Sequence, residues 1–439
     1  MPSVLRRVRE RRVRGRSGDG QPGALPPRQA RIRHTAGVAE TVTISDVRAA
    51  QDLLRGIARV TPMRSARWLA DKVGGPVDLK CENLQRAGSF KIRGAYTRLA
   101  RMTDEQRAYG VVAASAGNHA QGVALAASML GVRATVFMPE GAPLPKVSAT
   151  RGYGAQIEFV PGTIDDCLVR ARAFEAETGA VLVHPFDHPD IVAGQGTVGL
   201  EILEQRPDVR TVVVCTGGGG LLAGTAVAVK ALRPDVRVVG VQASGAAAYP
   251  LSLAEGHPVA LPSMATMADG IAVGRPGDVP FALVEGLVDE VRVVDDDAIA
   301  RALVLTLERS KLVVEPAGAA ATAAVLEHPA DFEPPVVVVV SGGNVDPLLL
   351  LRVVRHGLAA AGRYSTLTFR VPDRPGSLAA ILAALAAADA NVLEVEHARI
   401  DPLLRIDEVE IVVQVETRGP AHRDDMLARL VAEGLTVTT

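Results

Sequence analysis

Several residue types that carry chemistry or attach proteins to membranes are scarce in this 439-residue sequence. The three cysteines, Cys81, Cys167 and Cys215, lie far apart and show neither CxxC nor metal-binding spacing, so we expect no disulfide framework and no metal site. No stretch approaches the roughly 18 consecutive apolar residues of a membrane span. With a net charge of −1, these features predict a cytoplasmic protein without nucleic-acid or membrane partners.

Lysine is also scarce, because only six of the 48 basic residues are lysines. One of them, Lys91, lies in the stretch GSFKIRGA, residues 88–95. Arginine stays charged in proteins, whereas a desolvated lysine can lose its proton and act as a nucleophile. A lysine at a helix start with its stem on apolar surface is the ordinary explanation, and this stretch alone does not exclude it.

The first 41 residues differ from the rest of the chain. They contain ten arginines, three acidic residues and no aromatic residue, and their net charge is +7. Such a segment cannot bury enough apolar surface to order itself. We therefore expect residues 1–41 to be a disordered extension, or the product of an over-called translation start.

From residue 42 to about 362, short apolar runs alternate with alanine-rich helical segments. Apolar runs without polar alternation, joined by helices, indicate parallel sheets covered on both faces. The sequence therefore predicts a doubly wound α/β domain over 42–362, with ligands at the carboxyl ends of its strands. The clearest predicted strands are 110–115, 133–139, 155–162 and the valine-rich runs before residues 216 and 341.

The pattern changes in the last part of the chain, residues 363–439. Strands with alternating polar and apolar residues and two helical segments follow one another in the order β-α-β-β-α-β. This order describes a ferredoxin-like unit.

Three polar or glycine-rich motifs directly follow predicted strands. Four successive glycines, Gly217–Gly220, lie between a strand and a helix, where free backbone N–H groups can bind a phosphate. A plain tight turn is the alternative. The three motifs are SAGNHAQG (115–122), TGGGGLLAG (216–224) and SGGN (341–344).

The polar residues of these motifs also have ordinary structural explanations. Ser115 and Asn118 are of the residue types that cap helices, and His119 fits a hydrogen-bonded structural histidine. Ser341 ends a buried strand, where its hydroxyl needs a partner that is either a carbonyl or a ligand. Glu315, in VVEPAGAA, is a helix cap or a site residue.

In combination the motifs indicate one cofactor. An amine nucleophile, a phosphate-binding turn, a carboxylate-binding loop and a neutral partner for a ring nitrogen are what pyridoxal 5'-phosphate requires. The sequence therefore predicts a pyridoxal-phosphate enzyme.

The sequence resembles threonine dehydratase (threonine ammonia-lyase), in the tryptophan-synthase-β-like class of pyridoxal-phosphate enzymes, over residues 45–362. Its C-terminal residues resemble an ACT regulatory domain. The resemblance implies a catalytic domain of two doubly wound subdomains that converts L-threonine to 2-oxobutanoate and ammonia, and L-serine to pyruvate, in isoleucine biosynthesis. It rests on the motifs SFKIRGA, SAGNHAQG, GGGGLLAG, TMADGIAVGRPG (266–277), VVEPAGA and SGGN.

The resemblance also implies a role for individual residues. Lys91 is expected to bind the cofactor covalently and to move the substrate's α-proton. The other residues expected to bind the cofactor are Phe90, Asn118, Gly217, Gly218, Gly219, Gly220, Leu221 and Ser341. Those expected around the substrate carboxylate are Ser115, Gly117 and His119.

Serine racemase is the nearest competing assignment. Racemases of this class carry a second serine as the acid on the opposite face, and here that position is Ala116. At the positions of the racemase metal site this chain has Gln242, Ala246 and Ala248. We therefore expect dehydration without appreciable racemisation and without a strict metal requirement.

Two further classes stay open: a catalytically silent amino-acid sensor, and a synthase that forms a carbon–sulfur bond. Resemblance to ACT domains implies regulation by isoleucine or valine between paired domains of a homo-oligomer, a dimer or a tetramer, although the domain may serve only to hold subunits together. The expected effector site is the turn after the first ACT strand facing the next strand's start, with Asp373, Arg374, Gly376 and Asn391.

Overall fold

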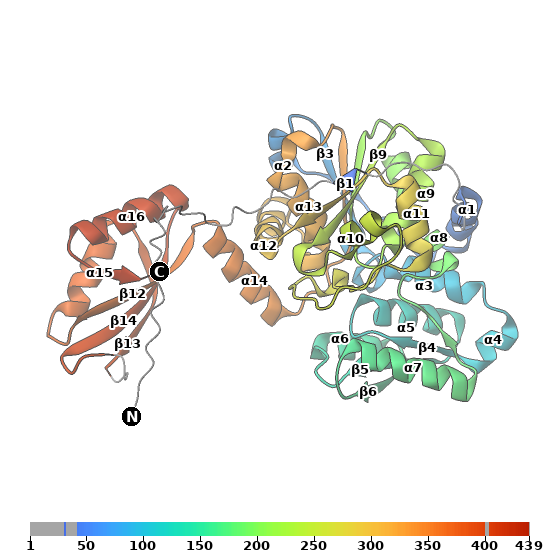
Figure 1. Ribbon diagram of the computed structural model, residues 1–439, viewed down its shortest axis with the longest axis horizontal. Coiled ribbons are helices and arrows are strands. Elements are labelled where there is room, and N and C mark those ends of the chain that lie inside the picture. The colour runs from blue at the N-terminus through green and yellow to red at the C-terminus, as the bar shows by residue number, and fades with distance from the viewer. Residues whose placement is uncertain (1–29, 32–41, 400–403, 439) are drawn as a thin grey trace, which may run out of the picture.

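The structure, a computed structural model, describes residues 30–31, 42–399 and 404–438. Two α/β units lie against each other, and a separate C-terminal unit follows helix α14 (Pro347–Ala360) (Figure 1). The expected N-terminal extension lies outside the described residues, except for β1 (Ala30–Arg31), which pairs with β10 (Glu290–Val294).

The larger unit is built on a seven-stranded sheet in the order β1-β10-β9-β8-β11-β3-β2. The five central strands are parallel to their neighbours, whereas β1 and β2 pair antiparallel at the two edges. The remaining strands are β2 (Met63–Ser65), β3 (Val77–Cys81), β8 (Thr211–Cys215), β9 (Arg237–Ala243) and β11 (Val336–Val340).

Both faces of this sheet are buried, which explains the uninterrupted valines of β11. Val336, Val338 and Val340 face one hydrophobic cluster, whereas Val337 and Val339 face the other. The first cluster includes residues of α2 (Arg67–Val73), α12 (Asp296–Leu305) and α13 (Pro316–Glu327). The second includes α1 (Ile44–Leu53), α8 (Pro189–Gln205), α9 (Gly220–Leu232), α10 (Ala248–Glu255) and α11 (Asp278–Leu287).

The smaller unit has a parallel four-stranded sheet in the order β6-β5-β4-β7. Helices α3 and α5 share one hydrophobic cluster with this sheet, and α7 shares another. The strands are β4 (Val111–Ala114), β5 (Ala134–Pro139), β6 (Gln156–Val160) and β7 (Val181–Leu182). The helices are α3 (Lys91–Ala100), α4 (Asp104–Tyr109), α5 (Asn118–Leu130), α6 (Leu144–Gly152) and α7 (Ile164–Thr178).

The C-terminal unit has the predicted β-α-β-β-α-β order. Its antiparallel sheet runs β13-β14-β12-β15, and alternate residues of β12 and β14 are buried beneath two helices. Its elements are β12 (Tyr364–Pro372), α15 (Ser377–Ala387), β13 (Asn391–Ala398), β14 (Glu408–Glu416), α16 (Pro420–Ala432) and β15 (Val437–Thr438).

Among the described residues, no helix has the length and apolar character needed to cross a membrane. The same residues contain no group of three or more His, Cys, Asp and Glu side chains placed to hold a metal ion.

Candidate active site

A cavity of about 570 Å³ lies where the carboxyl ends of strands from both parallel sheets meet. Strand β4 of the smaller sheet leads into it, as do β8 and β11 of the larger sheet. All the residues that the sequence predicts for cofactor and substrate binding line this one cavity: Phe90, Lys91, Ser115, Gly117, Asn118, His119, Gly217, Gly218, Gly219, Gly220, Leu221 and Ser341.

Lys91 is the first residue of α3, and its side chain is enclosed by the cavity. Its amine donates a 2.9 Å hydrogen bond to the carbonyl oxygen of Pro185 and lies 5.2 Å from the centre of the Phe90 ring. Burial lowers the pKa of the Lys91 amine to about 8, although Cys215 and Glu315 act in the opposite direction. A lowered pKa provides neutral amine near neutral pH, as a nucleophile requires.

The glycine motif forms the turn between β8 and α9. Gly219 has φ +101, and an added Cβ would lie 1.8 Å from the hydroxyl of Tyr249. An added Cβ at Gly218 would lie 2.4 Å from the Phe186 ring. The turn therefore requires glycine. It presents the free N–H groups of a helix start to the cavity, which is the arrangement that binds phosphate.

Ser341 follows the last residue of β11 and is buried at the cavity wall. Its hydroxyl oxygen accepts a 3.1 Å hydrogen bond from the thiol of Cys215, and burial raises the pKa of that thiol to about 11. Because the thiol keeps its proton and donates it, the serine O–H remains available to a ligand. The backbone carbonyl of Ser341 accepts from Phe90 N at 3.2 Å, which links this strand to the residue before Lys91.

Glu315 is a site residue, which answers one question that the sequence left open. It stands at the N-cap of α13 but makes no side-chain cap. Instead, it accepts a 2.6 Å hydrogen bond from the Asn118 amide, whose oxygen accepts one of 2.9 Å from Asn344. Burial, aided by Asp269, raises the pKa of Glu315 to about 7.

The SAGNH loop joins β4 to α5. The Ser115 hydroxyl accepts a 3.1 Å hydrogen bond from the N–H of Gly117, which is the N-cap of α5. His119 donates from Nε2 to the carbonyl oxygen of Val183 at 2.7 Å, and burial lowers its pKa to about 3. His119 is therefore a neutral, hydrogen-bonded histidine beside the cavity.

Sequence reasoning assigned no role to an ion pair that crosses this cavity. Lys146 on α6 contacts the Asp269 carboxylate at 2.5 Å, and both line the cavity from different units. They are 123 residues apart, so no local pattern links them. Two features of the sequence could have drawn attention to these residues: Lys146 is one of only six lysines, and Asp269 lies in the motif TMADGIAVGRPG.

The expected effector residues do not all come together within one chain. Asp373, Arg374 and Gly376 follow β12, and Asp373 pairs with Arg399 at 3.0 Å. Asn391 begins β13 opposite Glu416, the residue that also pairs with Tyr364 at the start of β12. The expectation that Asn391 faces the turn is therefore wrong for a single chain, because β12 and β13 both run antiparallel to β14 and start at the same end.

The donor set fits pyridoxal phosphate: an enclosed amine, a glycine turn at a helix start and a free serine hydroxyl. The Pyridoxal-phosphate dependent enzyme family matches residues 54–342, and the ACT domain family matches residues 365–432. The chain belongs to the pyridoxal-phosphate-dependent enzyme family. Its cofactor is therefore pyridoxal 5'-phosphate, and its C-terminal unit is an ACT domain.

Similarity to curated and solved proteins confirms the resemblance to threonine ammonia-lyases. The chain is 43% identical to the L-threonine ammonia-lyase of Thermotoga maritima, over 90% of this chain and 99% of that protein. The processed threonine deaminase isoform 2 of Solanum lycopersicum is 34% identical, with a TM-score of 0.73 and coverage of 78% of this chain and 94% of that one. Maize serine racemase is 38% identical, with a TM-score of 0.68 and coverage of 72% and 98%.

Proposed function

We propose that this enzyme is an L-threonine ammonia-lyase that releases 2-oxobutanoate and ammonia, with Lys91 as its catalytic residue. The observation that carries the proposal is the Lys91 amine itself. It is buried, its pKa is lowered to about 8, and it shares one cavity with the glycine turn and Ser341. The similarity to L-threonine ammonia-lyases along 90% of the chain supports the choice of reaction.

The proposed cofactor contacts follow from the cavity wall. Lys91 would hold the cofactor covalently in the resting enzyme, and Phe90 would pack beside its ring. Asn118 donates to the ring hydroxyl, because Glu315 and Asn344 hold its amide group in place. Ser341 donates to the pyridine nitrogen. The phosphate is held by the N–H groups of Gly217, Gly218, Gly219, Gly220 and Leu221.

The proposed steps use the same residues. Bound pyridoxal phosphate withdraws electrons from the substrate's α-carbon. Once the substrate amine had taken its place, the Lys91 amine would remove the proton from that carbon. The β-hydroxyl would take up a proton and leave as water, and hydrolysis of the remaining enamine would give 2-oxobutanoate and ammonia. Ser115, Gly117 and His119 surround the carboxylate. Because the Ser341 hydroxyl is neutral, it would hold the pyridine nitrogen without protonating it, and the weaker electron withdrawal would favour prompt elimination.

L-Serine is proposed as a second substrate, giving pyruvate. A pocket that accepts the additional methyl group of threonine gains only ~1–3 kcal/mol from it and accepts the smaller substrate too.

Racemisation is not part of the proposed activity, although a serine racemase is among the similar structures. Ala116 lines the cavity where a second serine would supply a proton. Detectable conversion of L-threonine or L-serine into its D-form would contradict this part of the proposal.

The proposed biological role is a regulated step of isoleucine biosynthesis in the cytoplasm. The ACT domain supports an amino-acid effector, and we propose isoleucine, with valine as the second candidate, bound at the turn that contains Asp373, Arg374 and Gly376. We further propose that the enzyme works as a homo-oligomer, a dimer or a tetramer, in which ACT domains pair.

The test follows 2-oxobutanoate formation from L-threonine by the wild type and by Lys91→Ala, each with and without L-isoleucine. We expect the keto acid from the wild type, none above background from the variant, and inhibition of the wild type by isoleucine. A folded wild type that binds the cofactor but releases no keto acid from threonine or serine would contradict the proposed reaction and favour an amino-acid sensor.

A further inference from the structure

Arg93 lies two residues after Lys91 in SFKIRGA, and its role is not explained by cofactor or substrate binding. At 3.6 residues per turn, two residues correspond to a rotation of roughly 200° about the helix axis. The two side chains therefore leave opposite sides of the first turn of α3. Lys91 lines the cavity, whereas Arg93 extends away from it and is only 1% exposed.

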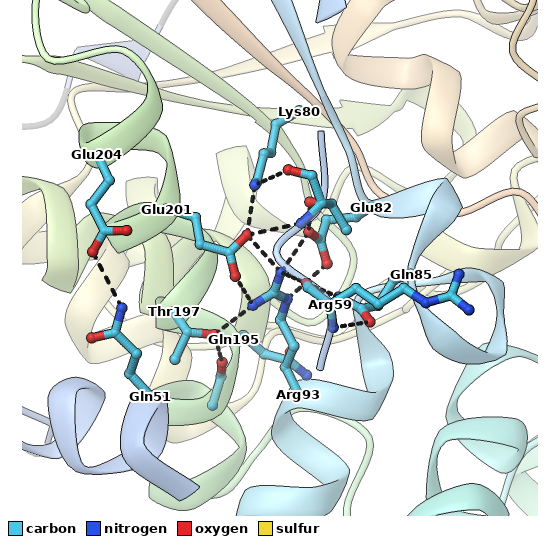
Figure 2. Close-up of polar contacts among 12 residues, drawn as sticks. Gln51, Arg59, Lys80, Glu82, Gln85, Arg93, Gln195, Thr197, Glu201 and Glu204 are labelled. Atoms are coloured by element: carbon cyan, nitrogen blue, oxygen red, sulfur yellow. Dashed lines mark hydrogen bonds and ion pairs between the residues drawn. The ribbon is translucent and has the colours of Figure 1, made fainter. Parts of the chain in front are cut away.

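The Arg93 guanidinium lies between two buried carboxylates (Figure 2). It contacts Glu82 through Nε and Nη2, each at 2.8 Å. It contacts Glu201 through Nη1 at 2.6 Å and through Nη2 at 3.0 Å. Thr197 accepts a further hydrogen bond from Nη1 at 3.0 Å.

Lys80 completes this group, which we name the α3 ion cluster: Lys80, Glu82, Arg93 and Glu201. The Lys80 ammonium donates to Glu201 at 2.6 Å, to the Thr61 carbonyl at 2.8 Å and to Gln205 at 2.9 Å. All three of its donors therefore have acceptors. With two positive and two negative charges, the cluster is electrically balanced although it is buried.

The α3 ion cluster joins the two α/β units. Lys80 belongs to β3 of the large sheet, Glu82 follows that strand, and Glu201 lies on α8. Helix α3 buries its apolar residues Ile92, Ala95 and Leu99 in the core of the smaller unit. Arg93 thus ties a helix of the smaller unit, two residues from Lys91, to the sheet that carries Ser341 and the glycine turn.

Such a cluster is poorly explained by stability alone. Replacing a buried ion group with well-packed apolar residues is often neutral or stabilising, because desolvation offsets the attraction between the charges. A planar guanidinium that contacts two carboxylates has only one good orientation, which a lysine ammonium does not reproduce. The geometry of Arg93 therefore restricts how α3 can rotate.

We propose that Arg93 is a positioning residue: the α3 ion cluster fixes the rotation of α3 on the large sheet and so holds the Lys91 amine against Pro185, opposite Ser341 and the glycine turn. This inference rests on the proposed role of Lys91. It adds that the reactivity of Lys91 depends on a group that touches neither substrate nor cofactor.

The test uses two cluster variants. One is Arg93→Lys, and the other is a double variant that carries both Arg93→Met and Glu82→Gln. The double variant keeps the charges of the cluster balanced, because Lys80 and Glu201 remain. Arg98→Lys is the matched control, since Arg98 is on the same helix and its ion pair with Asp190, at 3.4 Å, is partly exposed. The first readout is the pH dependence of Lys91 labelling by an amine-reactive reagent in cofactor-free protein, followed by peptide mass spectrometry. The second is kcat and KM for L-threonine with cofactor bound.

In both cluster variants we expect the Lys91 labelling curve to move to higher pH, towards an ordinary lysine. We expect kcat to fall by about 100-fold, as for a misplacement of roughly 1 Å, with KM for L-threonine nearly unchanged. The control should match the wild type in both readouts. If the double variant does not fold, Arg93→Lys, which keeps the charge, decides alone.

An unchanged Lys91 labelling curve in a folded cluster variant would overturn the inference, whether kcat is kept or is lost together with thermal stability. The labelling measurement needs neither cofactor nor turnover. Failure of the proposed function, seen as full activity of Lys91→Ala, is therefore distinguishable from failure of the positioning role.

Discussion

At the scale of single residues, two buried lysines differ in their surroundings as an ion-pair partner and the proposed nucleophile should. The Lys80 ammonium has a carboxylate and two further oxygen acceptors within 2.9 Å. In the described part of the chain, the Lys91 amine donates only to the Pro185 carbonyl. Desolvation lowers the pKa of both amines, but at Lys80 the contacting Glu201 carboxylate opposes it, whereas no carboxylate of the described residues contacts Lys91. The same side-chain type is therefore suited to structure at one position and to chemistry at the other.

His119 gives a prediction for pH dependence. Burial lowers its folded-state pKa to about 3, below the ordinary value of 6.5, so the unfolded chain takes up the proton first as pH falls. Stability is therefore present above pH 6.5 and is lost progressively below it. Between pH 6.5 and 5 this one group should lower the free energy of unfolding by about 2 kcal/mol.

The measurement is urea unfolding at pH 7 and at pH 5 for the wild type and for His119→Gln, whose amide nitrogen can reach the Val183 carbonyl. The variant should lose less stability than the wild type over this range. His184 is present in both proteins, so its contribution cancels in the comparison. An equal loss in both proteins would show that His119 does not carry this pH dependence.

Arg93 gives a prediction for stability. Arg93→Met alone leaves Glu82 and Glu201 buried with only Lys80 as a charged partner, and breaking a buried pair in this way costs about 3–5 kcal/mol. Adding Glu82→Gln restores the charge balance and should recover most of that loss. Chemical denaturation measures the free energy of unfolding of the single and the double variant. Equal values would contradict the claim that unbalanced charge destabilises the single variant.

Sequence reasoning found single residues where a motif limited the choices. Asn118 and Ser341 lie in motifs that follow predicted strands, and Lys91 lies in a motif where arginine would be the usual basic residue of this chain. The structure brings all three to one cavity, and their roles stay predictions. Sequence reasoning left Glu315 undecided between a helix cap and a site residue. The Glu315 carboxylate makes no cap and instead accepts a hydrogen bond from Asn118, 197 residues away, which no local pattern indicates.

At the scale of elements, residues of the junctions after β4, β8 and β11 line the cavity. Parallel strands place their carboxyl ends at one edge, so motifs that follow different strands meet without being close in sequence. The strand and helix order was predictable for this reason. The α3 ion cluster was not, because it joins β3, α3 and α8 across separations of up to 121 residues and its members follow no common period.

A substitution in the glycine turn between β8 and α9 should weaken cofactor binding. Gly219→Ala should weaken cofactor binding at least tenfold, because the added Cβ would lie 1.8 Å from the Tyr249 hydroxyl and would displace the turn that we propose to bind the phosphate. Gly256→Ala is the matched control, since Gly256 also has positive φ but nothing within 4 Å of an added Cβ. Both variants carry a left-handed backbone cost of roughly 1–2 kcal/mol.

Titration of the cofactor-free proteins with pyridoxal phosphate, followed by absorbance, measures the affinity. Gly256→Ala should bind as the wild type does. Equal affinities for all three proteins would contradict the assignment of the turn as the phosphate site.

At the scale of the whole molecule, catalytic and regulatory parts are separate in sequence. Every residue that lines the cavity lies between Phe90 and Ser341, and the ACT domain begins after α14 (Figure 1). The sequence predicted this division from the change in strand pattern near residue 362. It misplaced Asn391, because strand order alone does not tell which ends of β12 and β13 meet, and that depends on how both pair with β14.

Truncation after residue 362 tests this division. The truncated enzyme should keep its activity on L-threonine and lose its response to isoleucine, because the turn after β12 is removed while the cavity is intact. The measurement is the initial rate of 2-oxobutanoate formation at increasing isoleucine concentrations. Inhibition that persists in the truncated enzyme would place the effector site outside the ACT domain.

The central claim is that Lys91 is the residue joined to the cofactor. Reduction of the full-length, cofactor-loaded enzyme with borohydride, followed by peptide mass spectrometry, tests it most directly, because the chain offers only six lysines. We predict the pyridoxyl group on Lys91. A pyridoxyl group on any of the other five, such as Lys146 at the same cavity, would contradict it.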